Sequence, residues 1–202
     1  MMKLVLASTS PRRKELLGKL GLEFSIRAPN FVETRMAEES AFDYVKRNAK
    51  GKAESVFQLL KRESLESDFL VLGSDTVVVH GEAVLEKPKN EGEARSMLNA
   101  LSGRNHQVLT GYSLLSSDSQ HSEVTSCVST VVEFRKLFDE EIESYLKSGE
   151  PMDKAGSYGI QSIGASFVRS IHGSYTNVVG LPLAEVFEDL SKIVGSDFVP
   201  LA

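Results

Sequence analysis

Two neighbouring arginines stand at the start of a predicted helix, where they could bind an anion. Ser10 suits the N-cap position and Pro11 the first helical position, so the helix is predicted to begin directly before Arg12 and Arg13. A helix N-terminus presents unpaired backbone N–H groups and a partial positive charge. Cations are unfavourable there unless an anion accompanies them, and arginine holds phosphate oxygens in a planar fork. The pattern indicates a phosphate site; the alternative is a solvated helix start whose arginines point into water.

A single carboxylate interrupts the most hydrophobic segment of the chain. Residues 69–79 form an almost continuous apolar run, which predicts a central strand covered on both faces, and Asp75 lies within it. A buried ionised carboxylate is costly unless it is paired or bound to a metal, so we expect it mainly where it has a function. Gly73, two residues earlier, allows a bulge or the close approach of a ligand. The alternative is an aspartate that accepts hydrogen bonds from backbone N–H groups at a strand end.

Together these features suggest a divalent metal and a chain of phosphates. Mg²⁺ prefers carboxylate oxygens, substrate phosphates and retained water, so one or two acidic ligands are enough. A carboxylate beside such a metal could orient and deprotonate an attacking water. Arginines and Lys87, which follows a predicted turn, could neutralise charge that develops on the leaving group. The sequence has no Walker P-loop pattern, and no serine–histidine–acid or cysteine–histidine set stands out.

Composition limits the classes of protein that fit. The chain has 202 residues, 41% of them hydrophobic and 25% charged, which is ordinary for a globular protein and enough for one large or bilobed domain. A net charge of −5 argues against a general nucleic-acid or membrane-surface binder. The single cysteine, Cys127, excludes an internal disulfide and favours a cytoplasmic location. No apolar run approaches the length of a membrane span, the N-terminus lacks a signal-peptide pattern, and the four histidines have no metal-ligand spacing.

The remaining elements must position these groups. Hydrophobic periodicity predicts helices over 11–20, 41–62 with Ser40 as its cap, 91–101, from the cap Asp139 through 147, and from Pro182. It predicts strands over 4–7, 22–28, 69–79, 83–86, 106–115, 123–134 and 166–171. The polar turn at 116–120 predicts an antiparallel hairpin, and the tail from residue 195 is expected to fray. The glycine-rich stretch 149–161 is either a solvent loop or the floor of a site. Crossovers together with a hairpin imply an α/β or α+β fold with a mixed sheet.

Several ordered motifs resemble those of the Maf family. They are Leu-Ala-Ser-Thr-Ser-Pro-Arg-Arg at 6–13, Gly-Ser-Asp-Thr-Val-Val at 73–78, Glu-Lys-Pro at 86–88, Leu-Ser-Gly-Arg-Asn-His at 101–106, the stretch 149–161 and Asn-Val-Val-Gly-Leu-Pro at 177–182. Maf proteins are nucleoside triphosphate pyrophosphatases, also known as septum-formation inhibitors, that use Mg²⁺ or Mn²⁺. The resemblance implies one domain over residues 1–202, in which a long, bent mixed sheet flanked by helices joins two lobes around a cleft. That fold is related to inosine triphosphate pyrophosphatase, and a homodimer is compatible with it.

The resemblance also implies roles for single residues. Asp75 matches the family's catalytic acid, the proton acceptor that activates water, and Glu33 matches an acidic residue near the metal. The residues matched to substrate binding are Ser8, Arg12, Arg13, Lys52, Thr76, Lys87 and Gln161. Three of them, Arg12, Thr76 and Gln161, fall where the family sets base specificity. By itself Lys52, on the predicted 41–62 helix, would be expected to be solvated, so its role depends on the resemblance.

We therefore expect a metal-dependent enzyme that hydrolyses dTTP, UTP or modified pyrimidine nucleotides to the monophosphate and pyrophosphate. The stretch 149–161 resembles the branch of the family that prefers dTTP and UTP, and the Gln161 amide can both donate to and accept from a pyrimidine edge. Two alternatives stay open: a 7-methyl-GTP pyrophosphatase, and a nucleotide-binding regulator of septum formation with little turnover. Ser74 and Ser157 depart from the family's usual alanines, and each adds a hydroxyl without removing a functional residue.

Overall fold

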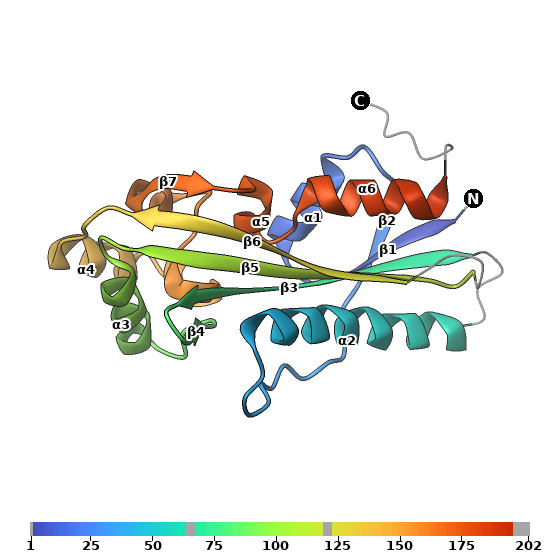
Figure 1. Cartoon of the computed structure of the whole chain (residues 1–202), viewed down its shortest axis with the longest axis horizontal. Coiled ribbons are helices and arrows are strands. Elements are labelled where there is room, and N and C mark those ends of the chain that lie inside the picture. Colours follow the sequence, from blue (N-terminus) through green and yellow to red (C-terminus); the bar gives the residue numbers. More distant parts are fainter. Residues whose placement is uncertain (1, 64–67, 119–122, 196–202) are drawn as a thin grey trace. The chain divides into compact units, whose positions relative to one another are not determined.

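The computed structural model describes residues 2–63, 68–118 and 123–195 (Figure 1). The predicted tail and part of the predicted turn at 116–120 lie outside these ranges. The strands are β1 (Lys3–Ala7), β2 (Phe24–Arg27), β3 (Phe69–His80), β4 (Ala83–Leu85), β5 (Asn105–Ser116), β6 (Val124–Phe134) and β7 (Val168–His172). The α-helices are α1 (Pro11–Gly18), α2 (Ala41–Arg62), α3 (Glu91–Leu101), α4 (Asp139–Lys147), α5 (Tyr175–Val179) and α6 (Leu183–Val194), and the short 3-10 helices are η1 (Glu150–Asp153), η2 (Ala155–Ser157) and η3 (Ile163–Phe167).

The strands form a mixed sheet, which confirms the predicted α/β class. Within the described ranges the strand order is β2-β1-β3-β5-β6-β7, and β4 pairs with β3. β1 is parallel to both β2 and β3, whereas the β3–β4 and β6–β7 pairs are antiparallel. β6 is the neighbour of β5 and runs back alongside it (Figure 1), as predicted for a hairpin. Among the described helices, none is apolar over a stretch long enough to cross a bilayer.

The chain divides into two compact units, and the first contains residues 1–75, 110–128 and 180–202. Its core lies between the sheet and α2, where apolar residues of β1, β3 and α2 pack together. The helix lies very close to the strands, because a Cβ added at Gly73 or Gly111 would collide with the backbone of α2. The next residue, Tyr112, donates a hydrogen bond to Asp189 of α6 at 2.7 Å. Since successive strand residues point to opposite faces, α2 and α6 cover opposite faces of this part of the sheet.

The second unit contains residues 76–109 and 129–179, with α3, α4 and the short 3-10 helices. An aromatic cluster lies at the centre of its core, with edge-to-face contacts of Phe134 to His106 and Tyr158. The start of β7 and the N-cap of α4 differ from prediction. β7 begins at Val168 because the preceding residues form η3, and α4 is not capped by Asp139. Instead its N-cap is Phe138, whose backbone N–H donates to the Glu141 carboxylate at 3.0 Å.

Candidate active site

The parallel strands β1 and β3 bring two predicted site segments together. Their register pairs Ala7 with Gly73, so Ser8 follows the end of β1 beside the part of β3 that carries Asp75. β3 continues past the end of β1 as far as His80, so Asp75 lies just beyond the last residue of β3 that pairs with β1, level with the turn that follows β1. The fold therefore places the start of α1 next to the strand that contains the buried carboxylate.

The turn between β1 and α1 is shaped by hydroxyl groups. The buried Ser8 Oγ accepts a hydrogen bond from the Ser10 backbone N–H at 3.1 Å. In turn, Ser10 Oγ accepts from the Arg13 N–H at 3.4 Å, which confirms Ser10 as the N-cap of α1. The first turn of α1 contains no acidic residue and begins with Pro11. Its positive end is therefore not neutralised by a carboxylate of its own, which favours an anion at this position.

Arg13 is held in place by the chain segment that leads into α6. Its Nε donates to the Gly180 carbonyl at 2.9 Å, and Ser74 Oγ donates to the same oxygen at 3.2 Å. Burial lowers the pKa of Arg13, whereas the negative charges of Asp75 and Glu33 act in the opposite direction. An arginine keeps its proton at any physiological pH, so this side chain is a fixed cation close to both carboxylates. The added hydroxyl of Ser74 thus has a structural partner.

Asp75 is buried, with 5% of its surface exposed, and both of its carboxylate oxygens have a side-chain partner from α2. Lys52 Nζ donates to Oδ1 at 2.7 Å, and Asn48 Nδ2 donates to Oδ2 at 2.8 Å. These partners, rather than backbone N–H groups at a strand end, account for the carboxylate within the apolar strand. A buried charge that is paired and hydrogen-bonded in this way is tolerated where an isolated one is not.

One ammonium group joins the two acidic residues predicted at the metal. Besides Asp75, Lys52 Nζ contacts Glu33 Oε1 at 2.8 Å. Lys52 itself is buried, and the Glu33 side chain is 45% exposed at the rim. Two carboxylate oxygens from distant parts of the sequence therefore converge on one cationic position. Hard oxygen donors arranged around a cation suit Mg²⁺ or Mn²⁺ chemically.

Asn48 is a partner of Asp75 that the sequence interpretation missed. It is fully buried, and its Oδ1 has no hydrogen-bond partner among the described residues. The signal for it was present, because Asn48 and Lys52 are one turn apart and lie within the apolar stripe of α2, beside Ala49 and Ala53. Two polar residues on the buried face of an amphipathic helix indicate a polar partner on the facing strand.

The comparison with known protein families gives a definite result. The family model described as Maf-like protein matches residues 3–193. The chain belongs to the Maf family. Among curated Maf relatives, the dTTP/UTP pyrophosphatase of Vibrio parahaemolyticus is 54% identical over 91% of this chain and 93% of its own length. The proteins with the same name from Vibrio vulnificus and Escherichia coli O157:H7 are each 50% identical, over 96% and 95% of this chain and 100% and 93% of their own lengths.

Among solved structures, a nucleoside-triphosphatase, or dITP/XTP pyrophosphatase, from Mycobacterium abscessus is similar to this Maf protein. It is 17% identical over 67% of this chain and 76% of that chain, with a TM-score of 0.37. The mixed sheet of the Maf chain is established by its own strand pairing.

Other residues that match the Maf motifs lie in different places. Arg12 is in the first turn of α1, half-buried, in the first unit. Thr76, Lys87 and Gln161 belong to the second unit. Thr76 directly follows Asp75 in β3, Lys87 is exposed after β4, and Gln161 is exposed at the end of the glycine-rich stretch. The structure thus brings together Glu33, Lys52 and Asp75 within one unit, and the roles of all the predicted site residues remain predictions.

The glycine-rich Maf stretch 149–161 is packed rather than solvated over much of its length. The Tyr158 hydroxyl and His106 Nε2 are 2.8 Å apart in the core of the second unit, and Tyr145 Oη accepts from the Gly159 N–H at 3.1 Å. Gly156 has a φ of 67° and lies against the side chain of Val78, so a larger residue would be strained and would collide there. These contacts anchor the stretch as far as Gly159, two residues before the exposed Gln161.

Proposed function

We propose that this chain is a nucleoside triphosphate pyrophosphatase that converts dTTP and UTP to the nucleoside monophosphate and pyrophosphate. The observation that carries the proposal is the convergence of two carboxylates, Glu33 and Asp75, on one ammonium beside a helix N-terminus with two arginines. The names of relatives that are 50% to 54% identical over almost the whole chain support the reaction and the choice of substrate.

Asp75 is proposed to accept the proton of the water that attacks the α-phosphorus. Each carboxylate oxygen has two acceptor sites, so the contacts with Lys52 and Asn48 leave capacity for a water. These two donors also fix the orientation of the carboxylate, because its torsion cannot change without breaking one of them. A general base that is held in hydrogen-bond reach of its water contributes about 10²–10⁴-fold to a rate.

Glu33 and Asp75 are proposed to hold the divalent cation. Two carboxylates would leave the rest of the coordination shell to substrate phosphates and water. That division of ligands suits Mg²⁺ or Mn²⁺, which bind through one or two carboxylates together with phosphates and water. When bound, the cation would supply positive charge to the phosphate chain and lower the pKa of a coordinated water.

The cationic side chains are proposed to bind and neutralise the leaving pyrophosphate. Arg13 is oriented by the Gly180 carbonyl, and Arg12 precedes it in the first turn of α1. By their match to the Maf motifs, Ser8 and Lys87 are each proposed to bind phosphate oxygens of the substrate. Because a guanidinium spreads its charge over several N–H donors, such groups stabilise charge that develops on the departing oxygen. Base recognition is assigned to Thr76 and Gln161, together with Arg12.

The reaction is tested by incubating the purified protein with dTTP and Mg²⁺ in water enriched in ¹⁸O and identifying the products by mass spectrometry. Attack at the α-phosphorus yields dTMP that carries the label and unlabelled pyrophosphate. Formation of dTDP and orthophosphate, or of labelled pyrophosphate, would contradict the proposed reaction.

The substrate is tested with a panel of dTTP, UTP, CTP and 7-methyl-GTP under identical conditions. We expect the highest kcat/KM for dTTP and UTP. A higher kcat/KM for 7-methyl-GTP would indicate that the chain belongs to the branch of the family that hydrolyses 7-methyl-GTP. Tight binding of dTTP without turnover would indicate a nucleotide-binding regulator. We further propose a cytoplasmic location, where a single cysteine stays reduced. A homodimer is proposed on family resemblance alone, and light scattering of the pure protein measures it.

A further inference from the structure

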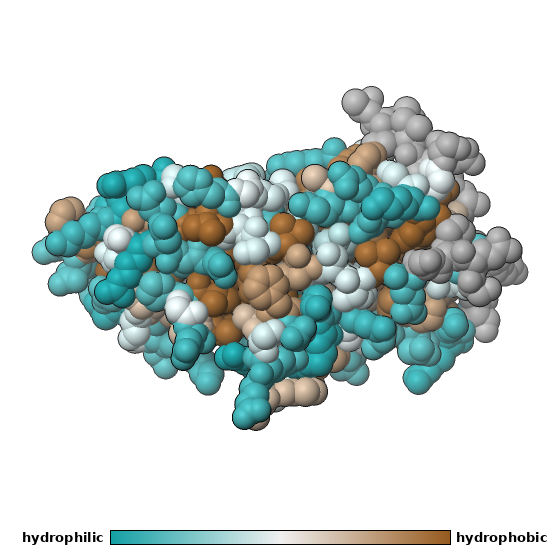
Figure 2. Space-filling view, in the orientation of Figure 1, coloured by the Kyte–Doolittle hydropathy of each residue, from teal (hydrophilic) through white to brown (hydrophobic). Residues whose placement is uncertain are grey.

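Glu33 lies on a segment that has no regular structure, so something other than a helix or strand must position it. Residues 28–36, between β2 and α2, form neither. Val32 and Met36 do not anchor it by burial, because their side chains are 80% and 60% exposed. In Figure 2 the tip of this connection, at the lower edge of the view, is mainly hydrophilic. Its position must therefore depend on specific contacts.

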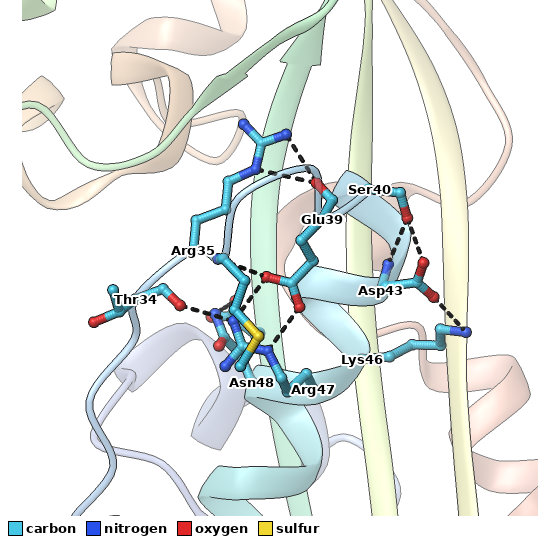
Figure 3. A network of polar contacts seen from close by, with 10 residues as sticks. Thr34, Arg35, Glu39, Ser40, Asp43, Lys46, Arg47 and Asn48 are labelled. Carbon is cyan, nitrogen blue, oxygen red and sulfur yellow. Dashed lines mark hydrogen bonds and ion pairs between the residues drawn. The ribbon is translucent and has the colours of Figure 1, made fainter.

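The first anchor is Arg47 of α2, which holds the segment on the C-terminal side of Glu33. Its Nε donates to Glu39 Oε1 at 2.6 Å, and one terminal nitrogen donates both to Glu39 Oε2 and to the Thr34 carbonyl, each at 2.8 Å (Figure 3). The Glu39 side chain is only 9% exposed, and the hydrogen bonds from Arg47 lower its pKa. Glu39 Oε2 also accepts from the Met36 N–H at 3.1 Å. Bidentate arginine–carboxylate pairs of this kind are strong and geometrically specific.

The second anchor is a contact between Phe31 and Gly51, on the N-terminal side of Glu33. A Cβ added at Gly51 would collide with the Phe31 ring, so the ring lies directly on the helix surface where a side chain is missing. Arg47 and Gly51 are one helical turn apart, and Lys52 is the next residue along α2. The two anchors and the ammonium that Glu33 contacts thus belong to one short length of helix.

We propose that Arg47, paired with Glu39, is a positioning residue that holds Glu33 on the Lys52 ammonium and thereby sets the affinity of the site for the divalent cation. The inference rests on the proposed function, in which Glu33 and Asp75 hold that cation. The hydrogen bonds of Arg47 go to Glu39 and to the Thr34 carbonyl, so in this proposal it acts through the segment that carries Glu33. Residues that orient a metal ligand typically change metal affinity by about 10–100-fold when they are removed.

The first test measures Mn²⁺ binding to the nucleotide-free protein by electron paramagnetic resonance. We expect Arg47→Met to weaken Mn²⁺ binding by about tenfold or more. Lys46→Met is the matched control: it removes the same charge from the neighbouring residue, whose partner is the exposed Asp43 at 3.3 Å. It should leave the affinity within about twofold of the parent protein. Hydrogen exchange of residues 32–39 should become faster in Arg47→Met and stay unchanged in Lys46→Met.

The second test separates positioning from a general loss of structure. If Arg47 acts through Glu33, Arg47→Met should weaken Mn²⁺ binding no further in a Glu33→Gln background. If the two residues act independently, the losses of Mn²⁺ affinity from the two single variants should add in the double variant. Gly51→Ala gives a variant that does not depend on Arg47. An alanine favours the helix by about 0.5–1 kcal/mol over glycine, so the fold should be retained while Phe31 is displaced and Mn²⁺ binding weakens.

Three results would overturn the proposal. The first is Mn²⁺ affinity in Arg47→Met and Gly51→Ala equal to that of the parent. The second is an equal loss of affinity from Arg47→Met with and without Glu33, and the third is a parent protein that binds no Mn²⁺. Any of these can occur while dTTP is still converted to dTMP and pyrophosphate, so this failure is distinct from a failure of the proposed function.

Discussion

Replacement of Lys52 by methionine should destabilise the protein severely, because it removes the cation that two carboxylates share. Lys52 Nζ lies 2.7 Å from Asp75 Oδ1 and 2.8 Å from Glu33 Oε1, and both Lys52 and Asp75 are buried. Methionine keeps most of the apolar stem of the side chain but cannot donate a hydrogen bond. Asp75 would then keep only Asn48 as a direct hydrogen-bond partner among the contacts described above.

The size of the stability loss in Lys52→Met follows from how deeply each partner of Lys52 is buried. Breaking a buried ion pair by removing one member costs about 3–5 kcal/mol, because the other charge remains buried without compensation. The Lys52–Glu33 contact adds little, since the Glu33 side chain is 45% exposed and an exposed pair contributes about 0–1 kcal/mol. For a chain of this length the loss corresponds to a fall in the unfolding midpoint of about 6–20 °C.

The assay is thermal and urea unfolding of Lys52→Met beside the double variant Lys52→Met/Asp75→Asn. The double variant should recover most of the lost stability because no buried charge is left unpaired. Mn²⁺ should stabilise Lys52→Met more than the parent, since both carboxylates are then without their shared ammonium. A midpoint for Lys52→Met within about 2 °C of the parent, or a double variant as unstable as the single one, would refute the reasoning.

Three further predictions concern the surroundings of the site. Asn48→Ala should lower the free energy of unfolding by about 1–3 kcal/mol and reduce kcat, because Asp75 Oδ2 loses its donor; urea unfolding and steady-state kinetics measure both. Gly73→Ala should cost about 1–3 kcal/mol and also reduce kcat, since the added Cβ collides with α2 and displaces β3 next to Asp75. Burial lowers the pKa of His106 to about 4, so below pH 6.5 the unfolded chain binds a proton that the folded protein does not. The free energy of unfolding should therefore fall between pH 6.5 and 4 by up to about 3 kcal/mol, and His106→Gln should remove this loss in urea titrations across that range.

The regular elements were the most predictable part of the molecule. Ser40 at the N-cap and an uninterrupted apolar periodicity predicted α2 from 41 to 62, and the structure has the same bounds. The long apolar run predicted β3 to within one residue at its C-terminal end. Such signals are local, because a capping residue and an apolar periodicity can both be recognised within a single segment of the sequence. The prediction that Asp139 caps α4 was wrong, although Asp139 is a residue type that often caps helices. The N-cap is its neighbour Phe138, whose backbone N–H donates to the Glu141 carboxylate.

The partners of the buried carboxylate were less accessible to sequence reasoning. Asp75 was identified as out of place in an apolar strand, which is a local signal, but its contacts come from residues 23 and 27 positions away. Lys52 entered the predicted site only through the resemblance to the Maf motifs. Asn48 was missed, although its place within the apolar stripe of α2 could have revealed it.

The segment that carries Glu33 could not be predicted at all. Its position depends on Arg47, Glu39 and a phenylalanine ring on Gly51, and none of these contacts produces a periodic pattern. The glycine-rich stretch was ambiguous for a similar reason, since its burial follows from single contacts such as that of Tyr158 with His106. Irregular segments are fixed by individual side chains, so their conformation is decided by tertiary contacts.

The central claim is that Asp75 activates the attacking water, and the most direct measurement is the turnover of dTTP by Asp75→Asn. We expect kcat to fall by about 10²–10⁴-fold while circular dichroism and the unfolding transition show a folded protein. Asp43→Asn, which removes an exposed carboxylate near the start of α2, is the control and should retain the parent's kcat. A folded Asp75→Asn protein with kcat within tenfold of the parent would contradict the account.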